Sequence, residues 1–305
     1  MASSNMKVGI CAIIKKIFSA QAPVWHPAPD SGMDVRMDNS FFRDKVIVIT
    51  GASDGIGKEL ALQLAAQGAL LSLAARSVEK LEAVAAECRG RGGTVLVVPT
   101  DVGLEADCAA LVQRTAAEFG RIDVLVNNAG ITMWANFEDM RDLGVFEHIM
   151  RVNYLGCIYC THFCLPYLKE TKGLVVGVSS LAGKTGVPAR SGYAASKHAV
   201  TGFLDSLRIE IAGSGVGVTV VYPDFVGTGE HARAFGPDGN PLGTSPVHSS
   251  RVMPVEECAR QIMDAMAHRR REQVMTFRGK LIQWVKLISP ALVDRFALRA
   301  IQKGR

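Results

Sequence analysis

The stretch VIVITGASDGIG, residues 46–57, decides the fold, because an apolar run passes directly into three closely spaced glycines. Its first five residues are all β-branched, which favours a strand, and from Ile56 onward apolar residues recur at helical spacing. Glycines allow the sharp turn between such elements and let the backbone approach a pyrophosphate at the N-terminus of the helix. The stretch therefore predicts a dinucleotide site, with a purely structural turn as the alternative.

The same alternation of strand and helix continues along the chain. Short apolar runs, separated by helical patterns, lie at residues 46–50, 70–75, 94–99, 122–127, 174–179 and 216–222, and residues 274–277 are a candidate last strand. Continuous apolar strands between helices are typical of a parallel sheet that helices cover on both faces. Right-handed crossovers then give an α/β fold with a doubly wound, Rossmann-type parallel sheet of about seven strands.

Composition divides the chain into three parts. Residues 1–40 read as an N-terminal appendage or linker, because prolines follow a short apolar run, and residues 41–278 form the Rossmann-type domain. Within that domain, residues 226–254 are rich in glycine and proline and follow the carboxyl end of a strand, where such sheets bind ligands. We expect this segment to be a substrate lid. Residues 279–305 form a basic amphipathic tail.

The net charge of +5 is concentrated near the C-terminus. From Arg269 onward the chain has ten lysines and arginines against two acidic residues, so this stretch holds more than the whole excess. Such a stretch favours an anionic surface, either membrane or nucleic acid, and a solvated face is the alternative. No nucleic acid is expected as a partner, because the sequence lacks interleaved aromatics and a recognised binding module.

The seven cysteines do not have the spacing of a disulfide framework. With no secretory signal before them, they predict reduced thiols in a cytoplasmic protein. Cys157, Cys160 and Cys164 raise the possibility of a metal site, but they also fit one face of a helix, and no further cysteine or histidine completes a zinc set. Packing is therefore favoured, and no metal is expected.

The end of the second strand indicates which nicotinamide cofactor is bound. Proteins that bind NAD place Asp or Glu there for the ribose 2′-hydroxyl, whereas NADP binders place a cation for the 2′-phosphate. Here the strand ends Ala-Ala-Arg-Ser, residues 74–77, without an acid, and Arg76 offers a bidentate fork to a phosphate. NADP (NADPH) is therefore favoured over NAD, with a solvated loop arginine as the alternative.

Tyr193 and Lys197 are the candidate catalytic pair. They stand four residues apart in a stretch that opens a helix, so their side chains share one face. An ammonium beside a phenol favours the phenolate. A tyrosine in that environment can pass a proton to a carbonyl oxygen while a hydride arrives at the carbon. A Tyr-x3-Lys pair alone is common, so the interpretation depends on the motifs that accompany it.

Together these motifs resemble the classical short-chain dehydrogenase/reductase family. The resemblance covers roughly residues 41–275, in the order and spacing typical of that family. Its motifs are Thr50-Gly51-x3-Gly55-x-Gly57, Asn127-Asn128-Ala129-Gly130, Asn153, Ser180 thirteen positions before Tyr193, and Tyr193-x3-Lys197. The chain is accordingly identified as a member of that family by resemblance.

The resemblance implies a role for each catalytic residue. Tyr193 would be the general acid in reduction and the general base in oxidation, and Lys197 would favour its ionised form and hold the nicotinamide ribose. Ser180 would hydrogen-bond the substrate oxygen together with Tyr193, whereas Ser179 does not fit the family's spacing. Asn153 would position a water that links Lys197 to solvent.

The resemblance also implies the cofactor contacts and shows two departures. Asp224 replaces the glycine that usually follows Pro223, and Asp54 stands where many NADP-preferring members have a basic residue. The implied contacts are Gly51, Ser53, Gly55, Ile56, Gly57, Arg76, Asp101, Val102, Asn127, Ala129, Gly130, Tyr193, Lys197, Pro223, Val226 and Thr228.

The resulting expectation is an NADP(H)-dependent oxidoreductase that interconverts a ketone or aldehyde and an alcohol. A catalytically silent NADP(H)-binding scaffold or redox sensor is the alternative, since a fold alone does not fix function. The apolar lid, with Met133 and Trp134, suits a lipid-like or steroid-like substrate, although these residues could instead pack the loop.

The long helical region at residues 147–168 and the family resemblance together predict a homodimer or homotetramer. The tail has two possible roles. It can rest on a membrane surface without crossing it, which would make a cytoplasmic protein peripherally membrane-associated. Alternatively, it can dock on the domain and cover the substrate cleft.

Overall fold

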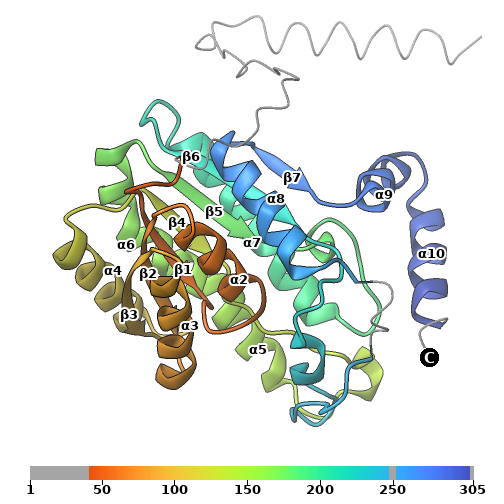
Figure 1. Ribbon diagram of the computed structural model, residues 1–305. Helices are drawn as coiled ribbons and strands as arrows, with labels where there is room; N and C mark the ends of the chain where they lie inside the picture. Colours follow the sequence, from red (N-terminus) through yellow and green to blue (C-terminus); the bar gives the residue numbers. More distant parts are fainter. Residues whose placement is uncertain (1–40, 247–251, 303–305) are drawn as a thin grey trace, which may run out of the picture. The chain divides into compact units, whose positions relative to one another are not determined.

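A seven-stranded parallel sheet forms the centre of the computed structural model, which describes residues 41–246 and 252–302 (Figure 1). The strand order is β3-β2-β1-β4-β5-β6-β7, and every neighbouring pair is parallel. The strands are β1 (Val46–Thr50), β2 (Leu70–Ala75), β3 (Thr94–Pro99), β4 (Val124–Asn127), β5 (Leu174–Val178), β6 (Gly217–Tyr222) and β7 (Glu272–Val274). The order reverses between β1 and β4, which confirms the doubly wound fold. The predicted appendage, residues 1–40, lies outside the described residues.

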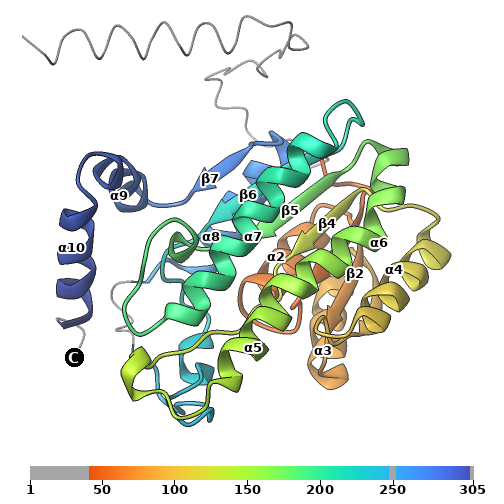
Figure 2. The same cartoon turned by 180° about the vertical axis from the view of Figure 1, so that it is seen from behind.

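Helices cover both faces of the sheet. α2, α3 and α8 lie in front of it in Figure 1, whereas α4, α5, α6 and α7 lie in front when the molecule is turned (Figure 2). Their bounds are α2 (Gly55–Ala65), α3 (Val78–Gly90), α4 (Glu105–Phe119), α5 (Gly144–Met150), α6 (Gly156–Thr171), α7 (Ser191–Glu210) and α8 (Val255–Ala267). The chain then continues through β7 into α9 (Phe277–Ile288) and α10 (Pro290–Gln302). No helix in the described ranges is long and apolar enough to span a membrane.

The central strands are largely apolar because both of their faces are covered. All five residues of β1 are buried, and Ile47 is aligned with Leu71 of β2 and with Val124 of β4. A strand in this position buries alternate side chains under helices on opposite faces, so it shows no polar alternation.

The last strand differs from the prediction. Residues 274–277 were the candidate, but β7 spans Glu272–Val274 and the chain has entered α9 by Phe277. The reason is a helix cap: the Thr276 hydroxyl accepts a hydrogen bond from the Gly279 N–H, which starts the helix. The pairing residues Glu272 and Gln273 are polar, so no apolar run marked them.

The helical region between β4 and β5 contains one wider turn. Residues Arg151–Leu155 form a π-helical turn that joins α5 directly to α6. Single π turns inside α-helices frequently occur at functional sites. Asn153, the asparagine that the family resemblance singles out, lies in this turn.

The cysteines of this region pack in the core. Cys157, Cys160 and Cys164 are all buried, as is Cys108 of α4, on which α6 packs. Burial raises the pKa of the Cys157 thiol to about 12, so these side chains stay protonated and apolar in character. Among the described residues, no group of three potential ligands could hold a metal ion.

Candidate active site

A cavity of about 1160 Å³ lies where the carboxyl ends of the strands meet the loops that follow them. Ligand pockets usually measure about 300–1,000 Å³, so this cavity has room for a dinucleotide and a substrate together. The predicted residues on its wall are Gly51, Ser53, Gly55, Ile56, Arg76, Asp101, Val102, Ala129, Gly130, Ser180, Tyr193, Lys197, Pro223, Val226 and Thr228. Three others, Gly57, Asn127 and Asn153, do not line it.

The glycine-rich turn between β1 and α2 has the backbone that the sequence predicts. Gly51 and Gly55 have φ values of +66° and +54°, a left-handed conformation that glycine adopts without strain. Gly57 has a packing role, because a Cβ there would lie 2.3 Å from the Gly51 carbonyl oxygen. On the other side, the Asn128 amide donates hydrogen bonds to the carbonyls of Thr50 and Gly51. The turn is thus held in a form that leaves its wall open to a phosphate.

Asp54 links this turn to the lid. Its carboxylate accepts the Gly55 N–H at 2.7 Å, which caps α2, and it is also paired with Arg233. Arg233 belongs to a short helical segment, Glu230–Arg233, within the predicted lid. Burial by itself raises the pKa of Asp54, but the hydrogen bonds from Arg233 and Gly55 outweigh it and hold that pKa below its usual value. Asp54, the acid that departs from the family pattern, is therefore paired with a cation, Arg233.

Arg76 lies at the far end of the cavity, directly after β2. It shares that part of the wall with Ser77 and Lys80, and it is exposed. Within the described part of the chain, its guanidinium has no hydrogen bond or ion pair, so its donors are open to a phosphate. Ser77 is already used, because its hydroxyl accepts the Lys80 N–H and caps α3.

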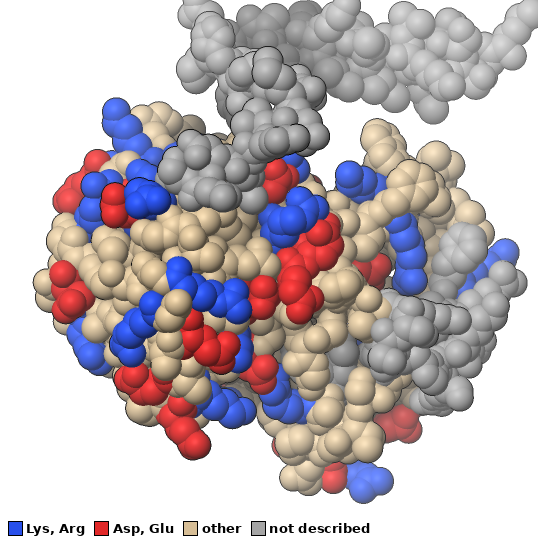
Figure 3. Space-filling view, in the orientation of Figure 1, with Lys and Arg blue, Asp and Glu red and all other residues tan. Residues whose placement is uncertain are grey.

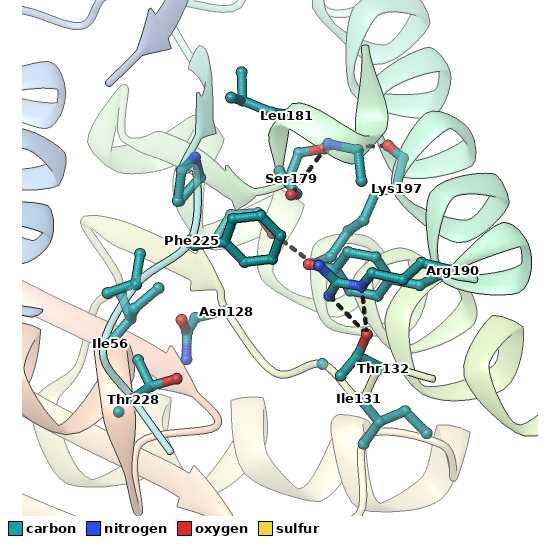
Figure 4. A pocket seen from close by; sticks show the side chains of 18 of the residues that line it. Ile56, Asn128, Ile131, Thr132, Ser179, Leu181, Arg190, Lys197, Phe225 and Thr228 are labelled. Atoms are coloured by element: carbon teal, nitrogen blue, oxygen red, sulfur yellow. Dashed lines mark hydrogen bonds between the residues drawn. The ribbon is translucent and has the colours of Figure 1, made fainter. Parts of the chain in front are cut away.

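Tyr193 and Lys197 lie on consecutive turns near the start of α7. Both are almost fully buried, with 7% and 5% of their surface exposed, and the Lys197 ammonium is 5.7 Å from the centre of the Tyr193 ring. The same ammonium donates a hydrogen bond of 2.8 Å to the Val178 carbonyl at the end of β5. Lys197 is therefore fixed to the sheet, and both residues line the cavity, in which Figure 4 labels Lys197.

The two neighbouring serines have different environments. The Ser179 hydroxyl is buried and donates to the Lys197 carbonyl at 3.2 Å, so it anchors α7. Among the described residues, the Ser180 hydroxyl is bonded only to the Ala182 N–H, which it accepts at 3.2 Å, so its own proton is not used there. Of the two serines, Ser180 therefore has the hydroxyl that lines the cavity with its proton unused.

Asn153 forms hydrogen bonds with the backbone of the segment that follows β4. Its amide oxygen accepts the Ile131 N–H at 2.8 Å, and its amide nitrogen donates to the Ile131 carbonyl and the Ser196 hydroxyl. A second, small cavity of about 10 Å³ is lined by Asn127, Asn153 and Lys197 among others. A water needs about that volume, so this space is suited to a single water beside Lys197.

The substrate end of the cavity has an apolar, aromatic wall. Trp134 and Phe225 have ring centres 6.4 Å apart, and Phe235 of the predicted lid segment also lies on the wall. The tail completes this end: Leu281, Ile282 and Val285 of α9 and Val293 and Ala297 of α10 line the same cavity.

Two polar residues of this wall, Arg190 and Thr132, were not singled out from the sequence. Arg190 contacts the Tyr193 ring, and its guanidinium donates two hydrogen bonds to the Thr132 hydroxyl, which are drawn in Figure 4. The contact joins positions 58 residues apart, so no local pattern indicated it. Asp224, noted as a departure, is accommodated without a left-handed backbone and accepts the Phe225 N–H and the Thr276 hydroxyl.

A glycine turn at the head of α2 and a buried tyrosine–lysine pair in one cavity define the class of nicotinamide-dependent oxidoreductases. The family described as short chain dehydrogenase matches residues 45–236. An Arabidopsis thaliana protein, 11-beta-hydroxysteroid dehydrogenase-like 4A, is 40% identical over 253 residues, which are 82% of each chain. Dehydrogenase/reductase SDR family member 7B of Mus musculus is 33% identical over 272 residues, 87% of this chain and 84% of that one.

Two solved structures extend the likeness to the fold. A short-chain dehydrogenase/reductase from Burkholderia phymatum in complex with NAD has a TM-score of 0.73 and 25% identity, covering 82% of this chain and 95% of its own. An alcohol dehydrogenase from Thermococcus sibiricus complexed with 5-hydroxy-NADP has a TM-score of 0.66 and 28% identity, covering 76% and 95%. The chain belongs to the short-chain dehydrogenase/reductase family, and it is an NAD(P)-dependent oxidoreductase that acts on CH–OH and C=O groups.

Proposed function

We propose that the protein uses NADP(H) to interconvert a hydrophobic ketone or aldehyde and the corresponding alcohol, with Tyr193 as the group that transfers the proton. The observation that carries this proposal is the burial of Tyr193 and Lys197 side by side on the wall of the cavity that the glycine turn opens into.

The bound cofactor supplies the hydride in reduction and accepts it in oxidation. In reduction, the Ser180 hydroxyl donates a hydrogen bond to the carbonyl oxygen, and the Tyr193 O–H bond breaks as its proton moves to that oxygen. The electron pair stays on the Tyr193 oxygen, where the Lys197 ammonium stabilises the charge. A water in the small cavity beside Asn153 would return a proton to this pair. Oxidation is the same sequence reversed.

Two features support NADP(H) over NAD(H). Arg76 and Lys80 put two cations on the wall directly after β2, and no acid occupies residues 74–77, where NAD binders hold the ribose 2′-hydroxyl. Arg76 has open donors that suit a 2′-phosphate.

The substrate class follows from the aromatic and apolar end of the cavity. Several relatives carry names of 11-beta-hydroxysteroid dehydrogenases, which supports a steroid-like or similarly sized lipid-like molecule. The test is consumption of NADPH by the purified full chain against a panel of hydrophobic ketones, with product alcohols identified by mass spectrometry. Binding of NADPH without turnover on any member would favour the alternative of a silent cofactor-binding scaffold.

We also propose a homo-oligomer that pairs through α6. This helix places the partly buried aromatic residues Tyr159, Phe163 and Tyr167 along the domain. Light scattering at micromolar concentration should give the mass of a dimer or tetramer, and Phe163→Arg should reduce it, because a charge in an apolar contact costs free energy. A wild-type mass of one chain would end this proposal.

The outer side of the tail supports contact with an anionic membrane surface. Phe277, Trp284, Leu287 and Ile288 are 81%, 68%, 79% and 85% exposed, while the opposite side of α9 lines the cavity. A cluster of large apolar side chains facing solvent is typical of an interaction site. Arg278, Lys280, Lys286 and Arg295 are exposed on the same two helices, and the coloured atoms at this end of the molecule in Figure 3 are mainly tan and blue. Basic residues beside apolar ones suit anionic lipid.

Vesicle flotation tests this contact. At low salt the full chain should float with vesicles that contain phosphatidylserine, and a Trp284→Glu/Leu287→Glu variant should stay in the aqueous fraction. Ile209→Glu is the matched control, because Ile209 is 73% exposed but lies on α7, so this variant should float. If the double variant floats like the wild type, the tail is not the membrane contact.

A further inference from the structure

One buried charge in the active site has no assigned role. Arg190 immediately precedes α7, three residues before Tyr193, and only 5% of its surface is exposed. It forms no salt bridge with any described residue. The preceding residue, Ala189, has φ of +62°, a conformation that side chains rarely adopt and that is retained at functional sites when the surroundings require it.

Of the aromatic rings around the Arg190 guanidinium, that of Tyr193 is the nearest. Its central carbon lies 4.1 Å from the centre of the Tyr193 ring, with Trp134 and Phe225 further away at 5.7 and 5.8 Å. Its Nε and one terminal nitrogen donate to the Thr132 hydroxyl at 3.2 and 2.7 Å. The Arg190 guanidinium is therefore stacked on the Tyr193 ring and hydrogen-bonded to Thr132 in the segment that follows β4.

These contacts only partly offset the cost of burying the charge. A buried cation normally has an anion beside it, whereas Arg190 has a neutral hydroxyl and aromatic faces. The group next to it that becomes negative during the reaction is the Tyr193 oxygen, which keeps the electron pair when its proton leaves. With so little exposed surface, Arg190 offers a substrate much less contact than it offers Tyr193.

We propose that Arg190 is a positioning residue that holds the Tyr193 ring and, as a second cation beside Lys197, stabilises its phenolate. This inference rests on the proposed function, because the phenolate forms when Tyr193 transfers its proton. Among the described residues, Arg190 and Lys197 are the cations that contact the Tyr193 ring. The other charged side chains on the cavity wall are Asp54, Arg76, Lys80, Asp101, Asp224, Arg233 and Arg278. Asp54 and Arg233 neutralise each other, and Asp224 is bonded to the Phe225 N–H and to Thr276.

Two substitutions at position 190 separate the charge from the packing. Arg190→Met keeps an apolar chain against the ring without charge, and Arg190→Lys keeps the charge without the planar fork. Arg190→Met should lower kcat about 10–100-fold at neutral pH, through loss of cation stabilisation and of correct orientation for proton transfer. The substrate KM and the Kd for NADPH should change little, and Arg190→Lys should recover much of the lost kcat.

The pH dependence of alcohol oxidation distinguishes this role of Arg190 from a purely structural one. The pH at which alcohol oxidation reaches half its plateau rate should rise in Arg190→Met and return toward the wild-type value in Arg190→Lys. Ionisation of Tyr193 can also be read without turnover, as the tyrosinate absorbance of each protein minus that of its Tyr193→Phe derivative. This titration tests Arg190 even if no substrate is turned over, so a failure of the proposed function is distinguishable.

The proposal is overturned if Arg190→Met leaves kcat and the titration unchanged, or if it raises only KM, which would make Arg190 a substrate contact. Should Arg190→Met fail to fold by circular dichroism, Thr132→Val serves instead, because it removes the acceptor and leaves the guanidinium in place. A smaller effect of the same sign is expected from Thr132→Val, and an unchanged titration would overturn the proposal.

Discussion

Replacement of Tyr193 by phenylalanine is expected to reduce turnover by about 10²–10⁴-fold, the usual contribution of a positioned proton donor. The substitution removes only the hydroxyl, and the ring keeps its contacts with Lys197 and Arg190. The cavity wall that would hold the cofactor is unchanged, so NADPH should bind with nearly wild-type affinity. The measurement is kcat for reduction of a hydrophobic ketone together with the Kd for NADPH by fluorescence titration.

Tyr167→Phe is the matched control for this prediction. Tyr167 is partly buried in α6 and does not line the cavity, so the same loss of a hydroxyl should leave turnover close to wild type. Near-normal activity of Tyr193→Phe would show that another group supplies the proton. Equal losses in both variants would point to a general effect on folding.

Arg76→Ala is expected to raise the Kd for NADPH by about 10–100-fold, because a hydrogen bond to a charged group contributes about 1.5–3 kcal/mol. The lower end of this range is favoured, since Arg76 is exposed and salt screens its charge. Affinity for NADH should not change, because NADH has no 2′-phosphate. The measurement is fluorescence titration of both cofactors against the wild type and the variant at fixed ionic strength.

Arg91→Ala controls for the loss of positive charge in general. Arg91 is exposed at the C-terminal end of α3 and does not line the cavity, so its removal should leave both affinities unchanged. Equal losses of NADH and NADPH affinity in Arg76→Ala would mean that Arg76 does not bind the phosphate.

The elements that could be predicted from the sequence are those whose environment is uniform along their length. β1 and β2 have the predicted bounds, because the inner strands of a parallel sheet are covered on both faces and therefore read as largely apolar runs. β3 also has its predicted bounds, although it is an edge strand, because its run of apolar residues is long enough to mark it. β7 did not follow this rule. It is a short edge strand with Glu272 and Gln273 in its pairing, and a hydroxyl cap at Thr276 decides where it gives way to helix.

The site likewise has features that could be predicted from the sequence and features that could not. The glycine turn and the Tyr193–Lys197 pair are local, since their geometry follows from spacing within one turn or one helix. Arg190 and Thr132 meet across 58 residues, and Asp54 and Arg233 across 179, so only the assembled fold brings them together. The tail was predicted as apolar and basic, but which side of α9 faces the cavity depends on how the helix is rotated against the domain, and the sequence alone did not fix that rotation.

The central claim is hydride transfer to a carbonyl with Tyr193 as the proton donor, and the most direct test follows the hydride itself. The full chain is mixed with a hydrophobic ketone and NADPH deuterated at the transferable position, and the product is examined by mass spectrometry. The account predicts an alcohol with one deuterium on the former carbonyl carbon, formed by the wild type and almost absent with Tyr193→Phe. An alcohol without deuterium, or undiminished deuterated alcohol from Tyr193→Phe, would contradict it.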